Sequence, residues 1–277
     1  LIMDDSTQLI LEELHRIRGL ELGEYRPHIP EKRVRERMAA LHITEPLQYR
    51  DVLQKDPSEC DRLIEAITIK WSRFFRNPMV FEMVSQEILP SIMEKKRRAG
   101  SREIRVWSAG CAGGEEVYSA AILIHQAVKK AKSRWDPMIF ATDISDKALK
   151  DARAGSYSRE SLVETKLGIL DRYFRRAGDR YEVRPFVKKM VRFSKDDLAS
   201  TVRFAPADSI FGSFDLVLCR NILIYFSLAL QGRVLEKLHR SLSKGGYLIL
   251  GDSDGLNKTM EQQFNIVNGR NRVFRKP

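Results

Sequence analysis

Cysteine is scarce in this chain of 277 residues, which contains three: Cys60, Cys111 and Cys219. They lie far apart and are odd in number, which argues against a disulfide framework and against a zinc site. Such cysteine usage is typical of a reducing compartment. We therefore expect a cytoplasmic protein that binds no metal.

Long hydrophobic runs are also absent, since no stretch approaches the roughly 18 apolar residues that cross a bilayer. The first residues, LIMDDSTQ, show no basic segment followed by an apolar one, so the sequence predicts neither a signal peptide nor membrane insertion. Hydrophobic residues make up 43% of the chain, which suffices for a sizeable core and argues against disorder.

Acidic residues are outnumbered, with 37 Asp and Glu against 48 Lys and Arg, and the net charge is +11. Such a charge favours acidic partners, which are nucleic acid, an anionic membrane face or an acidic protein surface. The charge alone does not choose among these partners. A basic protein without any polyanionic partner stays open as well.

Residues 1–90 lack a strand pattern and are predicted to be helical. Apolar residues recur at helical spacing after the capping candidates Asp5 and Ser6. A second predicted helix starts after Pro30, and its polar face carries Lys32, Arg33, Arg35 and Arg37. We therefore predict an N-terminal helical domain over 1–90 and an exposed charged linker near 90–101.

From about residue 103 predicted strands and helices alternate. The strands are EIRVWSAG, MIFATD, FDLVLCRN and GGYLILGDSD, and a hairpin is predicted in FNIVNGRNRVFRK. Apolar strands that alternate with helices indicate a mostly parallel sheet covered on both faces. The stretch near 155–190 interrupts this pattern and is predicted to be a small antiparallel insertion within a second domain over 91–277.

The glycine-rich loop SAGCAGGEE, at 108–116, connects a predicted strand to a predicted helix. Open parallel sheets bind ligands at that edge, and glycines let the backbone approach them closely. The phosphate-binding patterns GxGxxG and GxxxxGKS/T are absent, and Glu115 and Glu116 would repel a pyrophosphate. The loop thus favours S-adenosylmethionine over NAD or ATP, although two acids also complement the dipole of a helix N-terminus.

Further candidate residues stand at the ends of other predicted elements. Asp143 ends the second strand, where nucleotide-binding sheets place an acid that binds ribose hydroxyls, although Asp143 or Ser145 also suits the N-cap of the next helix. The run LCRNILIYF, at 218–226, ends another strand, and SRFFRNP, at 72–78, carries an arginine that suits a carboxylate. The signature of adenine N6 methyltransferases is absent, which weakens a nucleic-acid function.

In their order, these segments resemble the chemotaxis receptor glutamate methyltransferases, the CheR family, over most of the chain. The shared motifs are FFR, RVWSAG, GEE with YS, ATDI, CRN with IYF, and GGYLILGDS, together with the basic N-terminal helix. The resemblance implies an α/β fold with a Rossmann-like S-adenosylmethionine-dependent methyltransferase sheet. It also implies an N-terminal all-α subdomain and a small antiparallel β insertion that docks receptors.

The resemblance implies a set of cofactor-binding residues: Ser72, Arg76, Glu116, Asp143, Asp197, Leu198, Arg220 and Asn221. Arg76 and Glu116 are expected to bind the methionine end of the cofactor, and Asp143 the ribose. Asp197 and Leu198 are expected on the adenine side.

The implied activity is methyl transfer from S-adenosylmethionine to glutamate carboxylates of receptor cytoplasmic domains. The products are glutamate methyl esters, used in sensory adaptation, and S-adenosylhomocysteine. Arg76 and Tyr225 are the expected catalytic residues, near the reactive methyl group. Receptors are expected to meet the basic helix at Arg33, Arg35 and Arg37 and also the β insertion. We expect a monomer without a nucleic-acid partner.

Three departures from the family pattern leave alternatives open. Lys70 stands where the family commonly has Asn, in front of Ser72, and places a cation near a sulfonium cofactor. Val117 replaces a proline, and the family's GHSE reads GDSD here, with Asp252 and Asp254. The alternatives are a divergent methyltransferase for another substrate, and a non-catalytic adaptor that binds the cofactor.

Overall fold

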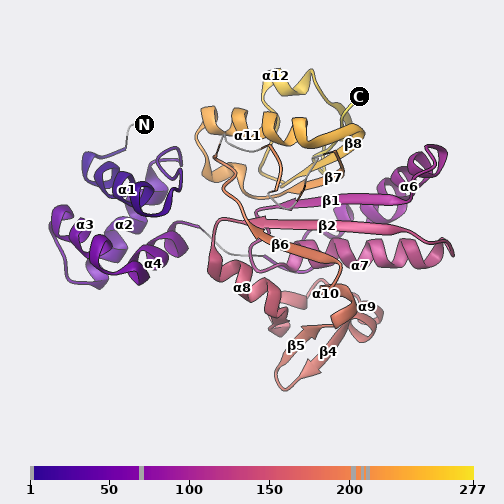
Figure 1. The fold of residues 1–277 in the computed structure, drawn as a ribbon, viewed down its shortest axis with the longest axis horizontal. Helices are drawn as coiled ribbons and strands as arrows, with labels where there is room; N and C mark the ends of the chain where they lie inside the picture. The colour runs from indigo at the N-terminus through magenta and orange to yellow at the C-terminus, as the bar shows by residue number, and fades with distance from the viewer. Residues whose placement is uncertain (1–2, 69–71, 201–203, 207–208, 210–212) are drawn as a thin grey trace.

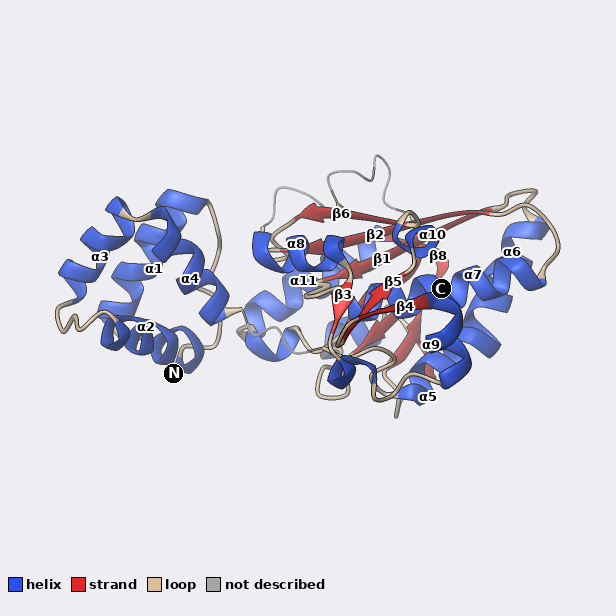
Figure 2. Cartoon of the chain, turned by 90° about the horizontal axis from the view of Figure 1, so that it is seen from below, coloured by secondary structure: helices blue, strands red, loops and turns tan. Residues whose placement is uncertain are grey.

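The computed structural model describes residues 3–68, 72–200, 204–206, 209 and 213–277. Its first part is a cluster of four helices, α1 (Asp5–Arg18), α2 (His28–Ala40), α3 (Pro46–Lys55) and α4 (Pro57–Ile67), seen beside the sheet in Figures 1 and 2. Asp4, one residue before the expected caps, is the N-cap of α1 and accepts a hydrogen bond from the Thr7 N–H. Gly19 ends α1 in the left-handed conformation.

The segment that the sequence predicts as a charged linker is helical. A continuous helical stretch runs through α5 (Pro78–Met83), the π-helical turn η1 (Val84–Ile88) and α6 (Leu89–Arg98). Leu89 and Ile92 are buried against the core of the sheet domain. In the last turn Arg97 and Arg98 are exposed, whereas Lys96 pairs with the buried Asp215 at 2.9 Å. The charge run is therefore the exposed face of a packed helix, which differs from the expected linker.

A seven-stranded sheet forms the second part, with strand order β6-β2-β1-β7-β8-β10-β9. The strands are β1 (Glu103–Ala109), β2 (Asp136–Asp143), β6 (Val191–Lys195), β7 (Phe214–Cys219), β8 (Leu242–Leu250), β9 (Asn265–Asn268) and β10 (Val273–Arg275). The first five in spatial order are parallel, and β10 pairs antiparallel with both β8 and β9, which confirms the predicted hairpin.

Two hydrophobic cores lie on the two faces of this sheet, because successive strand residues point to opposite sides. Val106, Ile139 and Leu216 share one core with α5, α6, α7 (Glu115–Lys130) and α8 (Asp146–Ala154). Trp107 and Val217 face the other core, which includes α11 (Leu228–Ser241), α12 (Lys258–Glu261) and the N-terminal helices. The sheet is thus covered on both faces, as the apolar strands predict.

A three-stranded antiparallel sheet forms the predicted insertion, with strand order β3-β5-β4. Its strands are β3 (Ser156–Tyr157), β4 (Phe174–Ala177) and β5 (Arg180–Val183), and its short helices are η2 (Arg159–Leu162), α9 (Leu167–Tyr173) and α10 (Pro185–Lys188). Figure 1 shows β4 and β5 projecting from the body of the molecule. Among the described helices, none is both long and apolar enough to span a membrane.

Candidate active site

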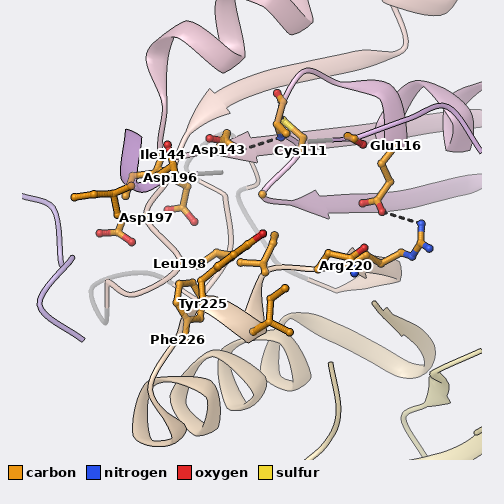
Figure 3. A pocket seen from close by; sticks show the side chains of 18 of the residues that line it. Cys111, Glu116, Asp143, Ile144, Asp196, Asp197, Leu198, Arg220, Tyr225 and Phe226 are labelled. Atoms are coloured by element: carbon orange, nitrogen blue, oxygen red, sulfur yellow. Dashed lines mark hydrogen bonds and ion pairs between the residues drawn. The ribbon is translucent and has the colours of Figure 1, made fainter. Parts of the chain in front are cut away.

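A cavity of about 290 Å³ opens at the carboxyl edge of the parallel strands. All the residues that the sequence singles out for cofactor binding or catalysis line it: Ser72, Arg76, Glu116, Asp143, Asp197, Leu198, Arg220, Asn221 and Tyr225. Figure 3 shows the side chains of most of them around one space. Because the carboxyl ends of parallel strands meet at one edge, residues far apart in the sequence converge there.

The loop after β1 approaches the cavity as bare backbone. Gly110 has φ +72°, and a Cβ on it would lie 2.0 Å from Ile222 Cδ1, so the close packing of the two loops requires glycine. The N–H groups of Gly110 and Cys111 both donate to the Thr142 carbonyl, which ties this loop to the end of β2. The loop after β1, which lines the cavity with Gly110, Cys111 and Ala112, is thus packed closely against the loop that contains Ile222.

Glu116 and Arg220 form a buried ion pair in the cavity wall. Glu116 Oε2 lies 3.4 Å from Arg220 Nη1, and Glu116 Oε1 accepts a hydrogen bond from Ser108 Oγ at 3.1 Å. Burial raises the pKa of Glu116, while the charges of Arg220 and Arg76 favour its ionised form. Arg220 Nε and Nη2 are buried without a hydrogen-bond partner in the described structure. These donors suit an anionic ligand group, such as the carboxylate of an amino acid.

Glu115, the other acid of the loop, has a different environment. It is buried at the start of α7 and is not among the residues that line the cavity. Burial raises its pKa, and its carboxylate lies beside Gly113. Its position agrees with the helix-dipole alternative that the sequence leaves open.

Asp143 stabilises the cavity floor at the end of β2. Its Oδ2 accepts a hydrogen bond from the Ala112 N–H at 2.8 Å and its Oδ1 accepts one from the Ser145 N–H at 2.9 Å. Ser145, and not Asp143, is the N-cap of α8. Each carboxylate oxygen of Asp143 has a second lone pair, so the residue can also accept from a ribose hydroxyl.

Asp197 joins the cavity to the N-terminal helical domain. Its Oδ2 accepts a hydrogen bond from the Glu21 N–H at 3.0 Å, and its Oδ1 accepts one from the Ala199 N–H at 2.9 Å. Leu198 follows, 8% exposed, and supplies an apolar wall beside it. A flat aromatic base between Leu198 and neighbouring backbone would suit this environment.

Tyr225 reaches the cavity from the short 3-10 helix η3 (Leu223–Tyr225). Burial raises the pKa of its hydroxyl, and the nearby charge of Arg76 works in the opposite direction. The protonated phenol is therefore the form present at neutral pH, and it can donate a hydrogen bond.

Tyr25 lines the cavity although the sequence did not point to it. It forms an isolated antiparallel β-bridge with Phe226, and the two rings meet edge to face with centroids 5.0 Å apart. The Arg26 N–H donates to the Tyr225 carbonyl at 2.9 Å. This contact joins residues about 200 positions apart, so no local pattern in the sequence could have revealed it.

The basic helix α2 is the second predicted functional surface. Its three arginines differ in exposure and in their ion-pair partners. Arg35 is exposed, and Arg33 forms an ion pair with Glu36 on the same helix. Arg37 instead forms a forked pair with the fully buried Glu59, with Nε–Oε1 and Nη2–Oε2 distances of 2.8 and 2.6 Å. Arg37 therefore holds α2 against α4, while Arg33 and Arg35 face outward. Lys70 lies outside the described residues.

Two family models match the chain end to end. "CheR methyltransferase, all-alpha domain" matches residues 5–68, and "CheR methyltransferase, SAM binding domain" matches residues 70–273. The chain belongs to the CheR methyltransferase family. It is an S-adenosylmethionine-dependent methyltransferase, and the unpartnered Arg220 donors, the bare loop backbone and the acids of the cavity fit that cofactor.

Three curated relatives are 29–32% identical to this chain over the aligned residues. A chemotaxis protein methyltransferase of Listeria monocytogenes is 32% identical over 236 residues, covering 85% of this chain and 84% of the relative. One from Borreliella burgdorferi is 29% identical over 265 residues, covering 94% and 92%. An uncharacterized 104.1 kDa protein of Rhodobacter capsulatus is 31% identical over 91% of this chain, which spans 25% of that protein.

One further curated relative and one solved structure are also similar to this chain. The probable biofilm formation methyltransferase WspC of Pseudomonas aeruginosa is 31% identical over 255 residues, covering 91% of this chain and 57% of WspC. Among solved structures, the magnesium protoporphyrin IX methyltransferase of Synechocystis PCC 6803 with bound SAM is 19% identical. It aligns over 69% of this chain and 77% of its own, with a TM-score of 0.35.

Proposed function

We propose that this methyltransferase esterifies glutamate carboxylates on the cytoplasmic domains of chemotaxis receptors, in the cytoplasm and as a monomer. The observation that carries the proposal is the single cavity in which Arg76 and Tyr225 lie together with Glu116 and Arg220. Support also comes from relatives that are named chemotaxis protein methyltransferases and cover most of the chain.

The reaction demands little proton transfer from the protein. S-adenosylmethionine, when bound, supplies a methyl group on a positively charged sulfur. A glutamate carboxylate is already ionised at neutral pH, so no general base is needed. The chain's contribution is to align the acceptor and to exclude water from it.

The cavity residues divide this work. Arg76 and Tyr225 would orient the acceptor carboxylate, one through its guanidinium and the other through its phenol hydrogen. Glu116 and Arg220 would hold the amino and carboxylate groups of the methionine end, because each offers the opposite charge. The remaining binding positions are assigned as follows: Asp143 to the ribose, Asp197 and Leu198 to the adenine, and Ser72 and Asn221 to the pocket wall.

The acceptor proteins would dock on the outward face of α2 and on the small β-sheet. Arg33 and Arg35 offer positive charge on that face, which complements acidic helices. Arg37 contributes less, because its guanidinium already forms a forked pair with Glu59.

The test is incubation with methyl-labelled cofactor and purified receptor cytoplasmic fragments, with RNA and a receptor-free protein mixture in parallel. Label on the receptor that is released as methanol by mild base identifies a methyl ester and supports the proposal. Base-stable label, or label on RNA alone, contradicts it. Binding of S-adenosylhomocysteine in calorimetry without label on any protein would point instead to a non-catalytic adaptor that binds the cofactor.

A second acceptor class is favoured by one relative. WspC is named a biofilm formation methyltransferase and is as similar to this chain as the chemotaxis enzymes are. A receptor-like protein outside chemotaxis is therefore the alternative acceptor. It would carry the same base-labile label when it replaces the chemotaxis receptor fragments in the assay above.

A further inference from the structure

The loop after β8, at 251–254, contains a buried carboxylate that fixes the chain after β7. Asp254 is 3% exposed. Its Oδ2 accepts hydrogen bonds from the N–H groups of Asn221 at 2.6 Å and Gly251 at 3.0 Å, and its Oδ1 accepts one from the Ile224 N–H at 3.1 Å. One carboxylate thus joins both ends of the turn that leads from Arg220 to Tyr225.

The same loop contains a second carboxylate, which contacts the segment that carries Arg76. Asp252 Oδ1 accepts a hydrogen bond from Asn77 Nδ2 at 2.8 Å. Asn77 directly follows Arg76, which lines the cavity. The 251–254 loop therefore contacts the segments that carry both proposed catalytic residues, Arg76 and Tyr225.

Asn77 and Asn221 share an uncommon backbone conformation. Their φ angles are +62° and +59°, in the left-handed region that few residues other than glycine adopt and that asparagine tolerates best. Each follows a cavity arginine, Arg76 in one case and Arg220 in the other. The direction of each arginine thus depends on a left-handed turn that is bonded to an acid of the 251–254 loop.

The fit between the loop and the second turn is close. A Cβ on Gly251 would lie 2.4 Å from the Asn221 nitrogen, so only glycine allows Asp254 to approach that N–H. A short loop that bonds two turns at such close range transmits any shift of one turn to the other.

We propose that the 251–254 loop is a positioning element that holds the two catalytic walls of the cavity in register. Asp254 fixes the position of the segment that carries Arg220 and Tyr225, and Asp252 fixes the position of the segment that carries Arg76. Neither acid touches the reacting groups. The proposal rests on the proposed roles of Arg76 and Tyr225, and it assigns a task to the two acids that replace other residues of the family pattern.

The test compares two buried aspartates on opposite edges of the sheet. Asp254→Asn removes the acceptor charge at the cavity edge. The control is Asp215→Asn, because Asp215 is 2% exposed, accepts the Arg105 N–H at 3.0 Å and pairs with Lys96 at 2.9 Å, away from the cavity. Both variants should lower the unfolding temperature, so stability alone does not separate them.

Affinity for S-adenosylhomocysteine, measured by calorimetry, separates the two roles. Asp254→Asn should weaken binding about 10-fold or more, since a displacement of about 1 Å in a site is costly. Asp215→Asn should leave the affinity unchanged, and Asp254→Glu should recover most of the loss because it keeps the carboxylate. Wild-type affinity in Asp254→Asn, or an equal loss in Asp215→Asn, would overturn the proposal.

Asp252→Ala tests the other contact. Its bond to Asn77 is exposed, so we expect a smaller effect, about a threefold loss in kcat with cofactor affinity nearly unchanged. An unchanged kcat would remove Asp252 from the proposal. S-adenosylhomocysteine binding requires no acceptor protein, so it tests the positioning role separately from the proposed function. A wild-type chain that binds S-adenosylhomocysteine without esterifying receptors would contradict the proposed function. The positioning role would then still be judged by the affinity of Asp254→Asn.

Discussion

Glu116 and Arg220 meet as opposite charges inside the cavity wall, one from the start of α7 and the other from the end of β7, with Oε2 and Nη1 3.4 Å apart. Their side chains are 12% and 2% exposed, so solvent screens the pair weakly. Each member keeps hydrogen-bonding capacity, Arg220 through its Nε and Nη2, so the pair fits the proposed contact with a zwitterion.

We expect Glu116→Gln to weaken S-adenosylhomocysteine binding by about 1.5–3 kcal/mol, the usual worth of a hydrogen bond to a charged group. Glu115→Gln is the matched control, since Glu115 is buried on the same helix turn without lining the cavity. Calorimetry measures both. Equal losses in the two variants would show that helix stability, and not ligand contact, is responsible.

The same carboxylate should make binding sensitive to acid. Burial raises the pKa of Glu116 above its ordinary 4.5, so the ionised form is lost at a higher pH than for a free glutamate. Affinity should therefore fall as the pH drops toward the raised pKa, and Glu116→Gln should flatten this part of the profile. A wild-type affinity that stays constant until the pH falls below the ordinary pKa of 4.5 would contradict the assignment.

Tyr225→Phe and Arg76→Ala should each lower kcat about 10- to 100-fold, because each removes a group that would align the acceptor. Tyr25→Phe is the control for the phenol, as Tyr25 also lines the cavity and is buried. Its kcat should change less than threefold, by the same reasoning on alignment. Normal methyl transfer by Arg76→Ala with normal cofactor affinity would exclude the role proposed for Arg76.

Arg35→Glu should raise the KM for the receptor fragment about fivefold, through loss of roughly 1 kcal/mol of electrostatic attraction, and the effect should shrink in high salt. Cofactor affinity should not change. Lys130→Glu, at the end of α7 and at the amino edge of the sheet, reverses an equally exposed charge as a control. If both variants raise KM equally, net charge and not α2 steers the receptor.

Glu59→Gln should lower the free energy of unfolding by about 3 kcal/mol, since it breaks a buried charge network. Burial acts to raise the pKa of Glu59, but hydrogen bonds from Arg37, Tyr49 and Arg62 outweigh it and the net shift is downward. The stabilisation is thus present above the ordinary pKa of 4.5 and is lost as the pH falls through the lowered value.

Denaturant unfolding of wild type and Glu59→Gln, at pH 7 and below pH 4, measures this pH dependence. The difference between their free energies of unfolding should be smaller at low pH. The exposed Glu36→Gln, which breaks the pair with Arg33, should change the free energy of unfolding far less than Glu59→Gln does at neutral pH. If the difference in free energy of unfolding between wild type and Glu59→Gln grows in acid, the lowered pKa of Glu59 is contradicted.

Gly110→Ala should destabilise the chain by about 1–3 kcal/mol and weaken cofactor binding, because the new Cβ would collide with Ile222. Gly178→Ala is the control, since its φ is also positive, at +64°, but nothing lies within 4 Å of a Cβ there. Its cost should be about 1 kcal/mol, without an effect on binding. If Ile222→Ala does not restore binding to Gly110→Ala, the collision is not the cause.

The sequence predicted the fold and the location of the site because both depend on local patterns. Apolar strands alternating with helices predicted the parallel sheet, and Asp143 and Arg220 stand at strand ends, which meet at one edge. Whether these residues bind the parts of the cofactor assigned to them stays a prediction.

The features that the sequence missed depend on contacts between distant segments. Tyr25 enters the cavity only because its backbone pairs with Phe226. Arg37 looked like its neighbours on a basic helix, yet it faces Glu59, and spacing within one helix does not reveal a partner on another. The run of charged residues at the end of α6 led to the prediction of a linker, although Leu89 and Ile92 form a buried apolar face on this helix.

The bridge between Tyr25 and Phe226 limits which segments of this chain can be exchanged with those of a relative. The helical domain is not a detachable module, because its 20–26 segment completes the cavity and bonds to the segment that presents Tyr225. A chimera that takes its helices from a relative must also take a matching 225–227 segment. A substitution in the helical domain that alters this contact would therefore also disturb the segment that presents Tyr225.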